Sequence, residues 1–304
     1  MTQGISGASI TRKARASREV YSPGRIAWRK LRSNKLAMFG MIFLTLLIIA
    51  VLLAPVLATH DRDAIEMFSM DKPPTEKFIL GTDSIGRDVY SRLLYGGQIS
   101  LGVGLAAVLL QVTIGVTLGA IAGYIGGAAD AIIMRLVDMI LCFPFYVIAI
   151  SMAAVFGGSA LNIIIIIGVL SWTGVCRIVR AQVLSLRSRE FTEAARALGL
   201  TPLEIIRSHM LPNCVSPIVV NATLGMASAI LTEAGLSFLG MGVTPPQPSW
   251  GNMLSAAQNI TALQHYWWQW LPPGLLVFMT VLCVNFLGDG MRDALDPRTR
   301  QAKE

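Results

Sequence analysis

The sequence contains little charge. Only 14% of its 304 residues are Asp, Glu, Lys or Arg, whereas soluble globular domains carry about 25%. Hydrophobic residues make up 54% of the chain, and the mean hydropathy is +0.60. This composition excludes an ordinary soluble domain and is typical of a membrane protein.

The sequence also lacks the residues that several kinds of site require. None of its six lysines follows a glycine, so the Gly-Lys step of a P-loop is missing and the chain cannot bind ATP in the usual way. The histidines, His60, His209 and His265, are widely separated, and HExxH and GxSxG do not occur. The four cysteines show no CxxC spacing, which indicates neither a disulfide framework nor a zinc site. We therefore expect no enzyme activity, cofactor or metal in this chain.

Stretches without charge predict the membrane spans, because a helix needs about 20 apolar residues to cross the hydrocarbon. Five windows of 25 residues or more lack Asp, Glu, Lys and Arg, and Gly157-Gly158-Ser159 divides the third. The six predicted spans are 37–57, 100–123, 131–156, 161–180, 214–235 and 271–289. A cleaved signal peptide is disfavoured for the first, because about 35 residues precede it and its apolar stretch is too long.

The distribution of Lys and Arg predicts the orientation. Of these residues, 20 fall in the two tails and in the connections on one side, and five fall in residues 58–98. Cytoplasmic connections carry the excess of positive charge, so both termini are expected in the cytoplasm. Anionic lipid is the expected partner of Arg25–Lys35. The net charge of +7 is then mostly a topological signal, and we expect no nucleic-acid partner.

The stretch FTEAARALGLTPLEIIRSHMLP at 191–212 predicts two short cytoplasmic helices. Gly199 suits the left-handed position that ends a helix. Thr201, Pro202 and Glu204 match the cap, first turn and capping box of a second helix. Pro212 is expected to stop this second helix at the membrane surface.

A helix pair of this kind has three interpretations. A loop that only connects two helices of a bundle is usually 2 to 8 residues long, whereas this connection has about 33 residues. A DNA-reading helix-turn-helix is disfavoured because a span anchors each end. Docking of a cytoplasmic protein remains, because the pair carries apolar residues beside Arg196 and Arg207, which cannot enter lipid.

The pattern Glu193-Ala194-Ala195, then Gly199, then an apolar run ending at Leu211-Pro212 resembles the EAA loop of ATP-binding-cassette importer permeases. Further blocks are similar to the second permease of the dipeptide, oligopeptide and nickel group. They are LGTDSIGRDVYSRLLYGGQISL at 80–101, GLSFLGMGVTPPQPSWGNML at 235–254 and NFLGDGMRDALDP at 285–297. The resemblance runs from about Trp28 to Pro297.

The resemblance implies an all-α membrane protein with six transmembrane helices and the type I ABC importer permease fold, in the bacterial or archaeal cytoplasmic membrane. It implies a second permease subunit, two ATPase subunits that bind ATP and Mg, and an extracytoplasmic solute-binding protein. The residues expected to couple to the ATPases are Glu193, Ala194, Ala195, Leu198, Gly199, Leu200, Thr201 and Pro202. Peptides are the leading substrate class, while nickel chelates, glutathione-like peptides and sugars stay open. The alternative from another class is a passive channel whose cytoplasmic loop binds a regulator.

The predicted organisation has five parts. They are a basic cytoplasmic tail at 1–36, a first transmembrane helix at 37–57, an extracytoplasmic loop at 58–98, a five-helix core at 99–290 that contains the coupling loop 181–213, and a cytoplasmic tail at 291–304.

Ionisable residues inside the spans are costly and need a partner or a wet cavity. Arg135 and Asp138 are three residues apart and are expected to pair on one helix face, which favours a packing role over a substrate role. Glu233 has no neighbouring cation in the sequence. It either contacts a cationic group of a transported solute or locks its helix to the following loop, and the sequence leaves both open.

Three further features lie in or near the spans. VYSRLLYGGQIS at 89–100 is expected to lie on the outer interface or in solvent. Trp267, Trp268 and Trp270 are most simply an interfacial aromatic belt. Gly115, Gly119 and Gly123 permit a close helix contact, either within the chain or with a second permease.

Overall fold

The computed structural model describes residues 23–295, and within that range it contains helices and one isolated β-bridge, between Thr82 and Asp88. The principal helices are α1 (Pro23–Ser33), α2 (Lys35–Leu52), α3 (Ala54–Leu57), α4 (Val89–Ile125), α5 (Gly127–Leu141), α6 (Phe145–Phe156), α7 (Ala160–Arg187), α8 (Glu190–Ala197), α9 (Pro202–Ile205), α10 (Leu211–Phe238), α11 (Trp250–Leu254), α12 (Ile260–His265) and α13 (Trp267–Leu295). Short 3-10 helices occupy Met67–Ser69 and Ser255–Gln258, and a π-helical turn occupies Ile206–Met210.

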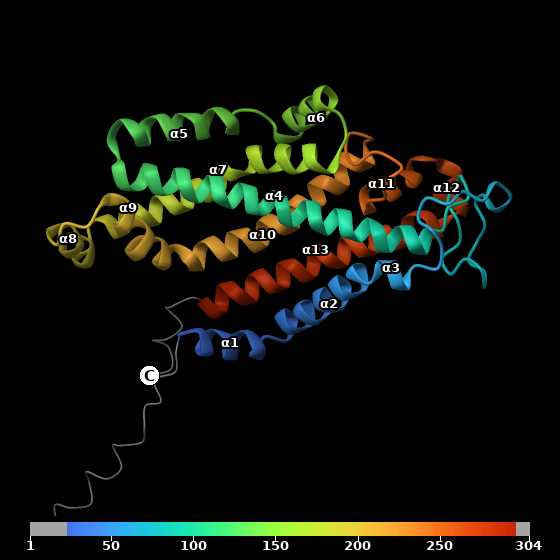
Figure 1. Cartoon of the computed structure of the whole chain (residues 1–304), viewed down its shortest axis with the longest axis horizontal. Helices are drawn as coiled ribbons and strands as arrows, with labels where there is room; N and C mark the ends of the chain where they lie inside the picture. Colours follow the sequence, from blue (N-terminus) through green and yellow to red (C-terminus); the bar gives the residue numbers. More distant parts are fainter. Residues whose placement is uncertain (1–22, 296–304) are drawn as a thin grey trace, which may run out of the picture.

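The long helices lie side by side in an elongated bundle (Figure 1). At one end of the bundle are α8, α9, α1 and the last turns of α13. The segment between α3 and α4 gathers with α11 and α12 at the opposite end. Sequence segments predicted to face the cytoplasm are thus separated along the bundle axis from those predicted to face outward.

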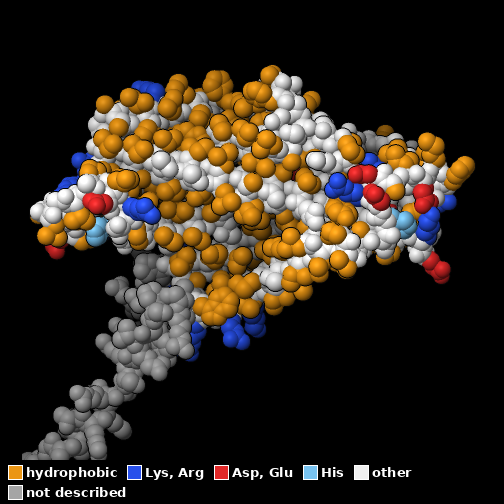
Figure 2. Space-filling view, viewed as in Figure 1, with side chains coloured by type: hydrophobic (Ala, Val, Ile, Leu, Met, Phe, Trp, Pro, Cys, Tyr) orange, Lys and Arg blue, Asp and Glu red, His pale blue; other side chains and the backbone are white. Residues whose placement is uncertain are grey.

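The surface also follows this division (Figure 2). Hydrophobic side chains cover the middle of the visible face, and charged side chains gather near the two ends. Five helices are long and apolar enough to cross a membrane, and the pair α5 and α6 raises the number to six if it is one span. The expectation of an all-helical membrane protein is confirmed.

The third predicted span, 131–156, is not a straight helix. α5 and α6 meet at an angle of 84°. The break falls at Phe143 and Pro144, and Pro144 is the cap residue of α6. Proline lacks a backbone N–H and disfavours helical conformation in the residue before it. The prediction of one continuous helix over 131–156 was therefore wrong, although the proline that breaks it is visible in the sequence.

Helix α4 begins at Val89, well before the predicted start of the second span near residue 100. Asp88 caps it by accepting a hydrogen bond from the backbone N–H of Ser91 at 2.9 Å. Ser91 and Arg92 are buried at 0% and 3% exposure. The stretch 89–100 is consequently not a solvated loop but a helical, packed part of α4.

Pro212 does not stop a helix. From Pro202 to Phe238 the chain is one helical segment that includes the π-helical turn at Ile206–Met210. Pro212 lies in the first turn of α10, directly after the π-helical turn, and local π-helical adjustments are one way in which a membrane helix tolerates a proline. The second short helix of the predicted pair is therefore the start of the span itself.

The glycines of α4 form a contact within the chain, with α7. A Cβ added to Gly119 would lie 2.6 Å from the carbonyl oxygen of Cys176, and one added to Gly115 would lie 2.8 Å from that of Trp172. At Gly123 the nearest atom would be the carbonyl oxygen of Arg180, at 2.8 Å. The two helices approach backbone to backbone along this line, as small residues permit in membranes.

Helix α2 lies at the edge of the bundle against α13. Gly40 faces the backbone of α13, because an added Cβ would lie 2.6 Å from the carbonyl oxygen of Cys283. Most of the large side chains of α2 remain exposed, among them Leu46 at 62%. The first span is thus peripheral.

We predict that Gly119→Val destabilises the protein, because the new side chain overlaps the backbone of α7. Overpacking of this kind typically costs about 1–3 kcal/mol. Gly102→Val is the matched control, since a Cβ at Gly102 on the same helix meets nothing within 4 Å. Thermal unfolding in detergent, followed by gel filtration, measures both variants. Equal stability of the two would show that the contact between α4 and α7 tolerates a larger separation.

Candidate functional site: the coupling segment and the polar cavities

The coupling segment, which we define as residues 190–205, begins with α8 and turns at Gly199. Gly199 has a φ of +81°, in the left-handed region that favours glycine. The backbone N–H of Leu200 donates to the carbonyl of Ala195 at 3.2 Å, and that of Gly199 donates to the carbonyl of Arg196 at 2.9 Å. These two bonds form a Schellman motif, so the predicted helix end at Gly199 is confirmed.

The next helix starts with the predicted capping box. The backbone N–H of Glu204 donates to the Thr201 hydroxyl, and the Glu204 carboxylate accepts from the backbone N–H of Thr201 at 2.8 Å. Pro202 occupies the first turn. Local hydrogen bonds therefore define the turn between α8 and α9 without help from the rest of the fold.

The coupling segment has a packed face and an exposed face. Ala195 and Ile205 are 5% and 0% exposed and pack with Val179 and Val183 of α7. On the outside, Leu198 and Leu203 are 80% and 73% exposed. The predicted coupling residues divide accordingly: Glu193, Ala194, Leu198, Gly199, Thr201 and Pro202 are exposed, Leu200 is half-buried, and Ala195 is buried.

Two side-chain contacts hold α8 against the bundle. The Thr192 hydroxyl donates to the carbonyl of Leu186, at the end of α7, at 2.8 Å. The Arg196 guanidinium lies 5.3 Å from the ring centre of Tyr124 on α4, within the range of a cation–π contact. A force on α8 is therefore transmitted to both α4 and α7.

The expected pair between Arg135 and Asp138 does not form. Asp138 Oδ1 instead accepts a hydrogen bond from Arg177 Nη2 of α7 at 2.6 Å. One helical turn away along α7, Arg180 Nη2 donates to Asp130 at 2.6 Å. Both acids of α5 thus bind arginines of α7, because α5 lies beside α7. The packing role inferred for Asp138 stands, with a different partner.

Glu233 is 0% exposed and connects three segments near the C-terminal end of α10. Its carboxylate accepts hydrogen bonds from the hydroxyls of Ser100 at 2.8 Å and Ser237 at 2.7 Å. Ser100 in turn accepts from the backbone N–H of Trp250, and Ser237 accepts from that of Val243. This geometry favours the interpretation that Glu233 locks α10 to the following loop, since every one of these partners belongs to the protein.

The end of the molecule opposite to the coupling segment contains a polar turn at GTDSIGRD. Asp83 accepts hydrogen bonds from the backbone N–H of Arg87 at 2.9 Å and from its Nε at 2.7 Å. Gly81 and Gly86 have φ values of +70° and +85°. Nearby, the Lys77 ammonium donates to the Glu66 carboxylate and holds the pKa of that exposed carboxyl below its usual range.

The tryptophans before the last span do not form a simple belt. Trp267 is 48% exposed, as an interfacial residue would be. Trp268 is 6% exposed and its Nε1 donates to the carbonyl of Thr82 at 3.1 Å. Trp268 therefore holds the polar turn against α13, and the belt prediction was wrong for this residue.

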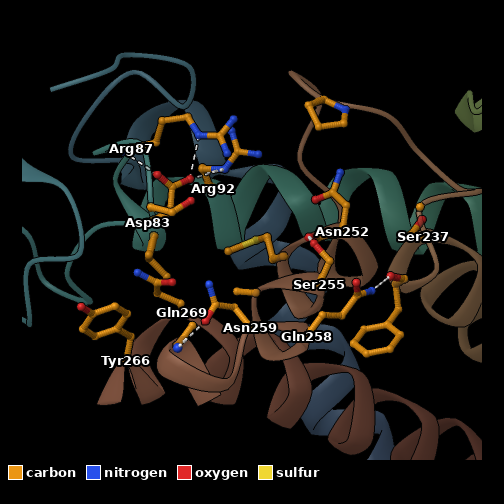
Figure 3. A pocket seen from close by; sticks show the side chains of 18 of the residues that line it. Asp83, Arg87, Arg92, Ser237, Asn252, Ser255, Gln258, Asn259, Tyr266 and Gln269 are labelled. Atoms are coloured by element: carbon orange, nitrogen blue, oxygen red, sulfur yellow. Dashed lines mark hydrogen bonds and ion pairs between the residues drawn. The ribbon is translucent and has the colours of Figure 1, made fainter. Parts of the chain in front are cut away.

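A pocket of about 570 Å³ opens between this turn and the segment that follows α10 (Figure 3). Asp83, Arg87 and Arg92 lie on one side of it, and Gln258 and Ser255 lie away from them. Much of the polar lining is already paired, as when Gln269 donates to Asp71 at 2.7 Å. The pocket is thus a rigid polar surface at the end of the molecule opposite to the coupling segment.

A second, smaller cavity of about 330 Å³ lies between the middle turns of α4, α7 and α10. Its polar lining consists of Gln111, Ser171, Asn221, Ser228 and Thr232. None of these residues was predicted from the sequence, because they carry no charge. The sequence feature that could have identified this cavity is the presence of uncharged polar residues near the middle of the spans.

Among residues 23–295, no group of three or more His, Cys, Asp or Glu side chains is placed to hold a metal ion. Cys142 is exposed, and Cys176, Cys214 and Cys283 are buried and unpaired.

Comparison with known proteins decides the family. The family described as binding-protein-dependent transport system inner membrane component matches residues 115–301, and the N-terminal TM domain of oligopeptide transport permease C matches residues 22–74. The chain belongs to the binding-protein-dependent inner membrane components. It is therefore a multi-pass transport permease of the inner membrane and not an enzyme, as expected.

Several curated members of this family of inner membrane components are similar over most of their length. A putative peptide permease protein of Brucella suis is 44% identical over 265 residues, which cover 87% of this chain and 88% of that protein. The di/tripeptide transport system permease protein DppC of Pseudomonas aeruginosa is 38% identical, covering 92% and 94%. The oligopeptide transport system permease protein OppC of Bacillus subtilis is 38% identical, covering 94% and 93%.

The fold of this inner membrane component is also similar to a solved structure. An inward-facing conformation of the MetNI methionine ABC transporter matches with a TM-score of 0.55 at 19% identity, over 67% of this chain and 96% of the matched chain. The predicted type I importer fold is confirmed. About a third of this chain lies outside the matched region.

We predict that Glu233→Ala destabilises the outer end of the fold, because it leaves two buried serine hydroxyls without their acceptor. Unpaired buried groups of this kind cost about 1–3 kcal/mol each. Glu233→Gln should cost less, since its amide oxygen retains one bond. Thermal unfolding in detergent measures both, with Glu76→Ala at an exposed position as the control. Normal unfolding combined with lost uptake would instead place Glu233 on the solute pathway.

Proposed function

We propose that this chain forms half of the translocation pore of an ATP-driven peptide importer and that its coupling segment docks onto cytoplasmic ATPases. The proposed partners are a second permease subunit, two ATPase subunits that bind ATP and Mg, and an extracytoplasmic solute-binding protein. The observation that carries the proposal is the coupling segment, which is rigidly capped, apolar on its outer face and tied to α4 and α7.

The exposed leucines of the coupling segment need a protein partner. Leu198 and Leu203 project at the same end of the bundle as the basic helix α1. Lipid is a poor alternative, because Arg196 lies on the same segment, Arg207 follows just after it, and charged groups are costly in hydrocarbon. An ATPase surface with a matching apolar groove would bury these leucines.

The chain lacks a P-loop. Because it has no nucleotide site of its own, the energy for transport must come from a partner that docks on the coupling segment. Moving a two-state equilibrium from 1:99 to 99:1 requires about 5.5 kcal/mol of differential binding. Closure of two ATPases around ATP would supply it through α8, switching the pore between outward-facing and inward-facing states.

We propose that both termini and the coupling segment lie in the cytoplasm. The coupling segment, α1 and the last turns of α13 share one end of the bundle. Arg29, Lys30, Arg32 and Lys35 would then face the anionic lipid of the inner leaflet. The polar turn and its pocket would face outward, where the solute-binding protein delivers its cargo.

Peptides are the proposed solute, since the relatives from Brucella, Pseudomonas and Bacillus are named for peptides. Nickel chelates, glutathione-like peptides and sugars are competing solutes, because selection in such a system lies largely with the binding protein.

We predict that Gly199→Asp and Glu193→Lys weaken association with the ATPases while membrane insertion stays normal. Gly199→Asp adds a charge and backbone strain at a φ of +81°, and Glu193→Lys reverses an exposed charge. Co-purification of the ATPases in mild detergent should fall by about tenfold, which corresponds to about 1.4 kcal/mol.

Gly157→Asp is the matched control for strain. Gly157 has a φ of +82° and ends α6, and an added Cβ there also meets nothing within 4 Å. It should retain the ATPases fully. Full retention and normal transport in Gly199→Asp and Glu193→Lys would refute the docking assignment.

We further predict that the chain, purified gently from its native membrane, is recovered with a second permease and P-loop subunits. Reconstituted into liposomes with its binding protein, this complex should take up a labelled dipeptide or tripeptide only when ATP is enclosed. Uptake of nickel or a sugar in place of peptide would revise the solute. A lone chain that conducts without ATP would support the passive channel.

A further inference from the structure

The cavity between α4, α7 and α10 lies at mid-span and has no ionisable residue in its lining. Gln111 belongs to α4, Ser171 to α7, and Asn221 and Ser228 to α10. Each of the three central helices thus contributes at least one uncharged polar side chain to the same space.

Gln111 is the decisive residue in this cavity. Its side chain is 5% exposed, and no hydrogen bond joins its amide to another of the described residues. Ser171 is half-buried and Ser228 is exposed, and both line the same cavity. Buried polar groups in proteins are nearly always hydrogen-bonded, and hydrocarbon offers no partners. The Gln111 amide therefore requires water or a ligand in the cavity.

Two glycines keep the cavity open. A Cβ added to Gly174 of α7 would meet nothing within 4 Å, so the space beside it is empty. Gly225 of α10 faces the Gln111 amide so closely that an added Cβ would collide with its Nε2. A larger residue at either position would shrink the cavity or displace the glutamine.

We propose that this cavity is the chain's contact surface for the transported solute and that Gln111 recognises the uncharged amide groups of a peptide backbone. The inference rests on the proposed function as a peptide importer. A carboxamide can donate to a peptide carbonyl and accept from a peptide N–H. The cavity lies at the small end of ligand pockets, which measure about 300–1,000 Å³, so it accepts one part of the solute.

The absence of charge in the lining has a consequence for selectivity. An ionised residue in a membrane cavity would attract peptides of one charge and repel those of the other. Gln111, Ser171 and Ser228 bind the amide groups that every peptide has, whatever its side chains carry. The contact therefore discriminates peptides from solutes without amides and leaves side-chain selection to the binding protein.

The test uses the complete transporter in liposomes and three peptides that are neutral, lysine-containing and glutamate-containing. Gln111→Leu should lower kcat/KM for uptake about tenfold, equally for all three. Gln111→Glu should instead favour the lysine peptide over the glutamate peptide, a charge preference that a residue with a purely structural role would not produce. Unchanged, charge-independent uptake in both variants overturns the proposal.

Gly174→Val tests the same cavity without touching Gln111. It should reduce uptake of all three peptides while Gly102→Val, which also adds a side chain where nothing lies within 4 Å, leaves uptake unchanged. Equal uptake in the two variants would contradict the assignment, and this comparison decides the matter if Gln111→Leu fails to assemble.

A labelling experiment separates a solute cavity from a contact with another subunit. In a Cys142→Ser background, which removes the one exposed cysteine of residues 23–295, Ser171→Cys should react with a water-soluble maleimide in the assembled transporter, and added peptide should slow the reaction. Labelling only in the separated chain would mean that the second permease fills the cavity, and would overturn the proposal.

The failure of this inference differs from that of the proposed function. If the unmodified transporter shows no ATP-driven peptide uptake, the proposed function is wrong and the inference falls with it. If the unmodified transporter takes up peptide but the Gln111 and Gly174 variants match the Gly102 control, only the inference is wrong.

Discussion

The close approach of α4 and α7 is the contact on which the rest of the structure depends. Apolar side chains gain little by leaving lipid for each other, so the fit between surfaces decides which helices associate. Gly115 and Gly119 bring the backbone of α4 against that of α7. The same two helices carry Gln111 and Ser171 into the mid-span cavity and hold α8 through Tyr124 and the carbonyl of Leu186.

Some polar groups have hydrogen-bond partners within the protein, and others do not. Glu233 and Trp268 are buried with protein partners, and each joins the outer segments to a span. Asp130 and Asp138 bind arginines of α7. Gln111 is buried, and no hydrogen bond joins it to another of the described residues; this contrast is the basis for the proposal that it contacts solute.

Features that depend on neighbours in the sequence were predictable. Gly199, Thr201 and Glu204 form the expected helix end and capping box, because a turn is decided within a few residues. Charge-free windows predicted six spans, and the structure has five long apolar helices, or six if α5 and α6 form one span. The coupling role of the segment came from resemblance to a family, and its exposed leucines agree with that role.

Features that depend on distant partners were not predictable. Arg177 lies 39 residues from Asp138, and only the packing of α5 beside α7 brings them together. The outer turns of α4 resembled a loop because Asp88 and Arg92 are charged, and their partners lie in other segments. The burial of Trp268 likewise depends on the carbonyl of Thr82, far away along the chain.

The continuous helical segment from Pro202 to Phe238 connects the coupling segment to the cavity between α4, α7 and α10. Ser228 lies about 38 Å along this axis from Leu203, at about 1.5 Å per residue. A tilt of about 5° about the end that carries the coupling segment therefore shifts the wall of the cavity by about 3 Å, the length of one hydrogen bond. Such a rotation is small enough to leave the packing of most side chains intact and large enough to exchange one set of polar contacts for another.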